Sequence, residues 1–177
     1  MTSDEVLVGK EMSDAFLHNY ELLKAESDRG AVLVASSVIE KALAGLIAAF
    51  LLENDSKSDE LFVGSNPPLG TLESKILIAY RLGLIRKVIR DSLSIFRRIR
   101  NDFAHNIETH SFDNQSVKNR LNEIYSLRYD QSSALDEIIS KSKEATSTRE
   151  KFLLFFAMDM AALQRIRLAI DRLAPLD

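Results

Sequence analysis

Hydrophobic side chains recur every three or four positions along most of the chain, which is the period of an amphipathic α-helix. The pattern predicts helices over about 4–25, 28–52, 72–82, 84–103, 113–127 and 133–143, the fifth opening at 113 or 116. A long last helix starts near 147 and keeps an apolar side through 170. Polar or proline-containing segments at 53–58 and 65–70 interrupt the pattern. We therefore predict an all-α bundle of about seven helices.

Polar residues just before three of these segments have the side chains that cap helix N-termini. Asp28 is the predicted N-cap of the second helix, and Thr71 is that of the third. Ser147 stands three residues before Glu150, which is the spacing of a capping box. Gly83 is expected to end or bend the third helix.

Composition agrees with one helical domain over residues 1–177. The chain has only six glycines and three prolines, too few for the many turns of an all-β fold. It has no cysteine, which excludes disulfides, thiolate metal sites and a thiol nucleophile, and which fits a reducing cytoplasm. The first residues lack the pattern of a secretory signal, so we expect a cytoplasmic protein.

The stretch 31–52 is apolar and long enough to raise the question of a membrane span. Glu40 and Lys41 lie in its middle, and charged groups are costly inside a bilayer. We expect a buried core helix and no membrane span.

The net charge of −3 gives no reason by itself to expect nucleic-acid binding. Residues 81–100, however, hold seven basic side chains and one acid, Asp91. Arg86, Arg90 and Arg97 form a row beside the apolar face of the fourth helix, and with Arg98 they are candidate nucleic-acid contacts. Solvated surface arginines are the alternative. A helix-turn-helix would need an exposed recognition helix, and the long, apolar block around this row argues against sequence-specific DNA binding.

Three polar residues at the end of the basic row have the chemistry to act on a phosphodiester. Arg100 can hold phosphate oxygens, and His105 can take a proton from a 2′-hydroxyl or give one to the leaving oxygen. Asn101 can orient the ribose, the base or His105. No metal or other cofactor is needed, and neither His18 nor His110 has further metal ligands nearby in the sequence. The alternative is that His105 caps a helix end and Arg100 pairs with an acid.

Helix geometry sets a condition on this candidate site. Five residues along an ideal helix turn two side chains about 140° apart. Arg100 and His105 therefore share one phosphate only if the helix frays or bends near Phe103, or if a second subunit completes the site.

An Arg, a polar residue beside it and a His four to six positions beyond the Arg resemble the signature of the HEPN superfamily. Arg100, Asn101 and His105 fill these positions. The resemblance implies a HEPN-like helical fold and a metal-independent RNA endonuclease of the toxin or defence kind, usually with two subunits facing one cleft. It also implies an added polar contact from Glu40, for which a buried pair with a Lys or Arg is the alternative.

The segments 68–72 and 75–85, PLGTL and KILIAYRLGLI, are similar to the mannitol operon repressor family. The similarity spans roughly 28–175 and is distinctive over 68–105. It implies a transcriptional regulator that acts through helical protein contacts. The Arg-Asn…Ala-His motif is cleaner here than in that family's repressor.

Two functions therefore stay open, a regulator and a metal-independent endoribonuclease, and whether the chain is an enzyme is undecided. The longer resemblance favours the regulator. In both cases we expect a homodimer, and the partner is a protein in the first case and RNA in the second.

Overall fold

The computed structural model describes residues 9–105, 111–140 and 147–175, which form seven α-helices and no strand. The helices are α1 (Lys10–Lys24), α2 (Asp28–Phe50), α3 (Leu72–Arg81), α4 (Lys87–His105), α5 (Gln115–Leu127), α6 (Tyr129–Ser140) and α7 (Thr148–Leu168). The prediction of an all-α bundle of about seven helices is confirmed.

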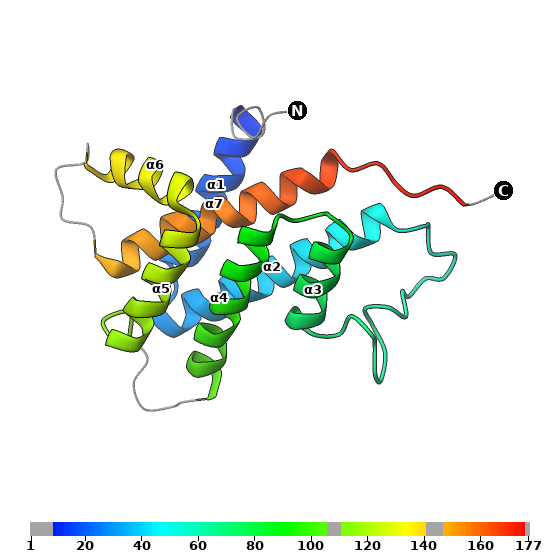
Figure 1. The fold of residues 1–177 in the computed structure, drawn as a ribbon, viewed down its shortest axis with the longest axis horizontal. Coiled ribbons are helices and arrows are strands. Elements are labelled where there is room, and N and C mark those ends of the chain that lie inside the picture. The colour runs from blue at the N-terminus through cyan, green and yellow to red at the C-terminus, as the bar shows by residue number, and fades with distance from the viewer. Residues whose placement is uncertain (1–8, 106–110, 141–146, 176–177) are drawn as a thin grey trace.

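α2 is the central helix, and it lies alongside α7 through the middle of the molecule (Figure 1). It also contacts α1, α3 and α4, and Ile39, Leu43, Leu46 and Ile47 are completely buried. Figure 1 shows α5 and α6 at one end of the bundle and the loop 51–71 at the other. α2 has the length and apolar character of a membrane span, but these contacts are those of a core helix.

Aromatic rings join α4 and α7 in the centre of the core. The ring of Phe156 lies 4.4 Å from that of Phe96 and 4.5 Å from that of Phe152, centroid to centroid. Phe112, just before α5, places its ring 4.6 Å from that of Phe152. Close tilted rings of this kind add to the hydrophobic gain of burial. The apolar side of the last helix is therefore core, as its spacing indicates.

Several helix boundaries differ from the predicted ones. Ser27, and not Asp28, caps α2, its hydroxyl accepting from the Gly30 N–H at 3.1 Å. α4 begins at Lys87 and not at 84, because the chain first turns through Gly83, whose φ is 75°. α4 also continues past Phe103 to His105.

The prediction of Thr71 as the N-cap of α3 is confirmed, since its hydroxyl accepts from the Ser74 N–H at 3.1 Å. Ser147 caps α7 as predicted, accepting from the Glu150 N–H at 3.1 Å. The Glu150 carboxylate accepts instead from the hydroxyl of Tyr20, at 2.7 Å. A capping box is present at Thr71 and Ser74, at the start of α3. α5 is capped by Asn114, and α6 begins at Tyr129 rather than near 133.

Candidate functional site

Arg100, Asn101 and His105 lie on one continuous helix, α4, which does not end or bend at Phe103. The side chain of His105 is exposed, and Arg100 is half-buried. Because the helix is unbroken, its geometry turns Arg100 and His105 about 140° apart. Within one chain the two side chains do not face one point, so a shared phosphate site requires a second copy of the chain.

The side chains that share the outward face of α4 with His105 are Asn101 and Arg98. Helical spacing places Asn101 about 40° and Arg98 about 20° from the direction of His105. Arg100 donates to the Asn101 Oδ1 at 3.1 Å. Its partner is therefore the next residue on the helix, and not an acid as in the alternative interpretation of the sequence. Arg29 caps this end of α4 by donating to the Ala104 carbonyl at 3.0 Å.

Two of the four candidate nucleic-acid contacts form ion pairs with acids. Arg97 pairs with Glu73 of α3 at 3.0 Å. Arg90 binds Asp91, with a shortest contact of 2.5 Å, and its guanidinium lies 4.6 Å from the centre of the Tyr80 ring. Charges engaged in this way contribute less to the field that attracts a phosphate backbone.

Asp91 is shared between two bases. Lys87 donates to it at 2.7 Å, and this hydrogen bond, followed by that from Arg90, holds the pKa of the Asp91 carboxyl below its usual range. In the described part of the chain, Arg86 and Arg98 are the members of the predicted row whose side chains form no ion pair. The row is therefore not a continuous strip of free cations.

Glu40 forms an ion pair with Lys75 of α3. It accepts from the Lys75 Nζ at 2.7 Å, and the Lys75 side chain is only 7% exposed. This is the alternative given by the sequence, a pair that joins α2 to α3. His18 is exposed on α1, and His110 lies outside the described residues. Among the described residues no three His, Asp or Glu side chains group as metal ligands do.

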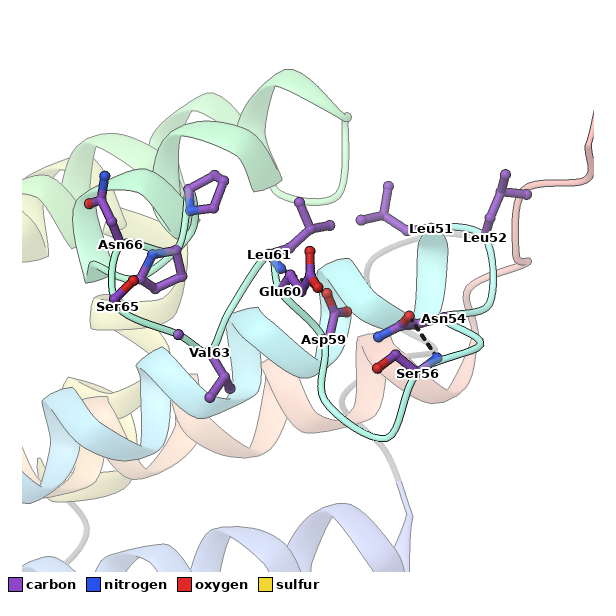
Figure 2. Close-up of a pocket in the computed structure, with 13 residues that line it drawn as sticks. Leu51, Leu52, Asn54, Ser56, Asp59, Glu60, Leu61, Val63, Ser65 and Asn66 are labelled. Carbon is purple, nitrogen blue, oxygen red and sulfur yellow. Dashed lines mark hydrogen bonds between the residues drawn. The ribbon is translucent and has the colours of Figure 1, made fainter.

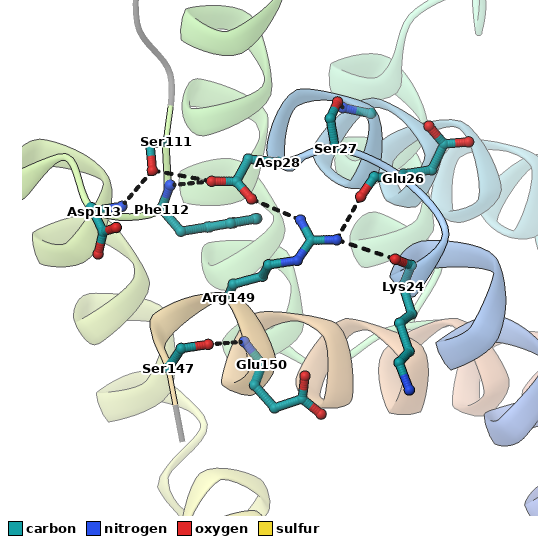
Figure 3. Close-up of polar contacts among 11 residues, drawn as sticks. Lys24, Glu26, Ser27, Asp28, Ser111, Phe112, Asp113, Ser147, Arg149 and Glu150 are labelled. Atoms are coloured by element: carbon teal, nitrogen blue, oxygen red, sulfur yellow. Dashed lines mark hydrogen bonds and ion pairs between the residues drawn. The ribbon is translucent and has the colours of Figure 1, made fainter. Parts of the chain in front are cut away.

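A polar cluster at the α1–α2 junction was not foreseen (Figure 3). Arg149 of α7 donates to Asp28 at 2.7 Å and to the carbonyls of Lys24 and Glu26. The other oxygen of Asp28 accepts from the backbone N–H of Phe112 at 3.0 Å. These contacts hold three helix ends together, so the cluster is structural.

A second polar cluster is buried in the core. Arg128 pairs with Asp159 of α7 at 2.8 Å, and the two side chains are 9% and 6% exposed. Gln131 donates to the same carboxylate at 3.1 Å, and Ser92 of α4 accepts from Arg128 at 3.4 Å. This network joins α4, α6 and α7.

The loop 51–71 carries the open pocket of the described structure (Figure 2). Its volume is about 860 Å³. Figure 2 shows Ser65 and Asn66 on one side, Asn54 and Ser56 on the other, and Asp59, Glu60 and Leu61 between them. Residues 53–58 and 65–70 were predicted only as breaks between helices, although the apolar run Leu61-Phe62-Val63 between them was a signal of structure.

Comparison with known proteins establishes the fold of this chain and not its family. No family model and no curated protein sequence matches it. Two solved bacterial structures share the fold. One is MtlR, a mannitol operon regulator, in its complex with HPr from Escherichia coli, with a TM-score of 0.62 and 17% identity over 85% of this chain and 99% of that one. The other is YggD from Shigella flexneri 2a str. 2457T, a possible transcriptional regulator, with a TM-score of 0.60 and 16% identity over 94% of this chain and 97% of that one.

Proposed function

We propose that this chain is a cytoplasmic regulator of transcription, of the mannitol-operon-repressor type, that acts by binding another protein. The observation that supports this most is the shared fold over 99% and 97% of two regulator-like proteins, one of which is bound to the protein HPr. The residues that resemble the mannitol operon repressor family in sequence, 68–72 and 75–85, include all of α3 except Glu73 and Ser74.

The surface of α4 supports protein contact over DNA reading. A recognition helix presents free polar side chains to the major groove. Here Arg90 and Arg97 are tied to Asp91 and Glu73, and the inner face of α4 is held in the core by Phe96 and Ile99. Lacking a free basic row, α4 is poorly suited to enter a DNA groove.

The first partner to test is HPr, because HPr is what the E. coli neighbour binds. Purified chain titrated with the HPr of its own cell in a calorimeter is expected to form a saturable complex. DNA from the promoter of a regulated operon, at physiological salt, is expected to show only weak binding without sequence preference. Sequence-specific DNA binding by the isolated chain would overturn the protein-contact mechanism.

A second candidate function is metal-independent RNA cleavage by a dimer. The observation in its favour is that exposed His105 shares a face of α4 with Asn101, while Arg100 lies one turn earlier on the same helix. In this proposal Arg100 from one copy holds the phosphate and His105 from the other moves the proton, because one chain alone turns them apart.

RNA incubated with the purified protein in EDTA tests this second function. Cleavage is expected to leave 2′,3′-cyclic phosphate ends and to be lost in Arg100→Ala and in His105→Ala. Arg81→Ala is the matched control, because it removes an exposed arginine of α3 that is not a candidate nucleic-acid contact, and Arg98→Ala tests a neighbouring candidate contact. Loss of activity in Arg98→Ala alone would place the phosphate contact elsewhere, and intact RNA at every protein concentration would end the proposal.

A further inference from the structure

The loop that joins α2 to α3, residues 51–71, is long and ordered. It runs for about twenty residues without a helix, and ordered loops of this length are usually functional. Hydrogen bonds within the loop backbone fix its conformation. The Leu69 N–H donates to the Leu61 carbonyl at 2.8 Å, and the Val63 N–H donates to the Asp59 carbonyl at 3.0 Å. Phe62 and Leu69 pack against the core. The pocket is therefore formed before any partner arrives.

Apolar side chains of this loop face solvent instead of the core. Leu52, Leu61 and Val63 line the pocket and are 51%, 38% and 61% exposed. Leu173, which is 44% exposed, is brought to the same end of the molecule by the hydrogen bond from its N–H to the Phe50 carbonyl (Figure 1). Clustered exposed apolar residues mark a contact surface more often than scattered ones do.

The charge of the pocket is of one sign. Asp59 and Glu60 line it, and none of its lining residues is a Lys or an Arg. One oxygen of Asp59 accepts from the Leu61 N–H at 3.0 Å, and Glu60 has no ion pair within the described residues. A pocket that combines exposed leucine and valine side chains with carboxylates and no lining cation favours an occupant that is both apolar and positively charged.

We propose that the pocket of loop 51–71 is the docking site for a basic segment of a partner protein, with an apolar side chain seated against Leu61 and Val63. This deepens, and rests on, the proposed role as a regulator that binds a protein. A preformed backbone lowers the entropy that binding must overcome, and complementary charge speeds association and sets specificity. An open pocket of about 860 Å³ along a single loop has room for several residues of an extended segment.

The test uses the full chain and a random peptide library displayed on phage. Peptides that bind the wild type are selected, and their affinities are measured by fluorescence anisotropy at low and at physiological salt. Val63→Asp and Glu60→Lys are the test variants, because neither side chain makes a hydrogen bond or ion pair in the described structure. Leu77→Asp and Glu123→Lys are the matched controls, since these replace an exposed leucine of α3 and an exposed acid of α5.

The enriched peptides are expected to combine Lys or Arg with a large apolar residue, and to bind more weakly as salt rises. Val63→Asp and Glu60→Lys are expected to lower the affinity for these peptides about tenfold or more. The two controls are expected to leave this affinity unchanged. Acidic peptides, or peptides that bind all variants equally, would overturn this docking site while leaving a protein-binding regulator intact. Self-association lost in Val63→Asp would make the occupant a second copy and would also overturn it. Failure of the chain to bind HPr or any other protein would remove the proposed function itself.

Discussion

Replacing Asp159 by alanine is expected to be among the most damaging single changes in this protein. Its carboxylate accepts from the two terminal nitrogens of Arg128, at 2.8 and 3.3 Å, and from Gln131 at 3.1 Å. The Arg128 side chain is only 9% exposed, so in Asp159→Ala a buried positive charge loses its counter-ion. Breaking a buried pair on one side costs about 3–5 kcal/mol.

The measurement is the free energy of unfolding from urea denaturation followed by circular dichroism. Asp136→Ala is the control, because its carboxylate is 56% exposed and pairs with Lys151, and loss of such a surface pair costs about 1 kcal/mol or less. The double variant Arg128→Met/Asp159→Leu is expected to lose less than Asp159→Ala alone, because it leaves no unpaired charge. An Asp159→Ala cost equal to that of Asp136→Ala would refute the reasoning.

Three further substitutions each test one local feature of the fold. Arg149→Ala is expected to cost about 2 kcal/mol of unfolding free energy, since charged hydrogen bonds at the α1–α2 junction are lost, and Arg149→Lys should recover part of it. Burial, followed by the hydrogen bond to Glu150, raises the pKa of Tyr20 to about 12. Because the folded pKa lies above the unfolded value of about 10, this contribution to stability is complete below pH 10 and is lost as the pH rises through 12. The difference between ultraviolet titrations of the wild type and of Tyr20→Phe should give Tyr20 a pKa of about 12, and a pKa near 10 would contradict this. Gly83→Ala should cost about 1 kcal/mol in the same urea assay, because the φ of Gly83 is 75°, and an unchanged stability would contradict it.

The apolar spacing was sufficient to find the helices, because burial of a continuous face decides where a helix packs. Ile99 and Phe103 are completely buried on α4 as predicted. The ends of helices were harder to predict, since partners distant in sequence decide them. Asp28 looks like an N-cap, but Arg149, 121 residues away, binds its carboxylate, and Ser27 supplies the cap.

The candidate site was also predictable only in part, because contacts formed in the folded chain decide which side chains stay unpaired. Residue types suggested free arginines at 90 and 97, but Arg97 pairs with Glu73 through the packing of α4 on α3, and Arg90 pairs with Asp91 through its rotamer. The pocket of loop 51–71 escaped prediction because polar and proline residues mark a loop without giving its path. The run Leu61-Phe62-Val63 shows that one residue can anchor a loop while its neighbours stay exposed.

The most direct test of the central claim is transcript profiling of a deletion strain complemented with three versions of the gene. If the chain is a regulator that binds a protein through loop 51–71, the deletion changes a defined set of transcripts. The wild type and His105→Ala then restore them, and Val63→Asp, expressed at the same level, does not. Restoration by Val63→Asp but not by His105→Ala would contradict this account and favour the RNA-cleaving function.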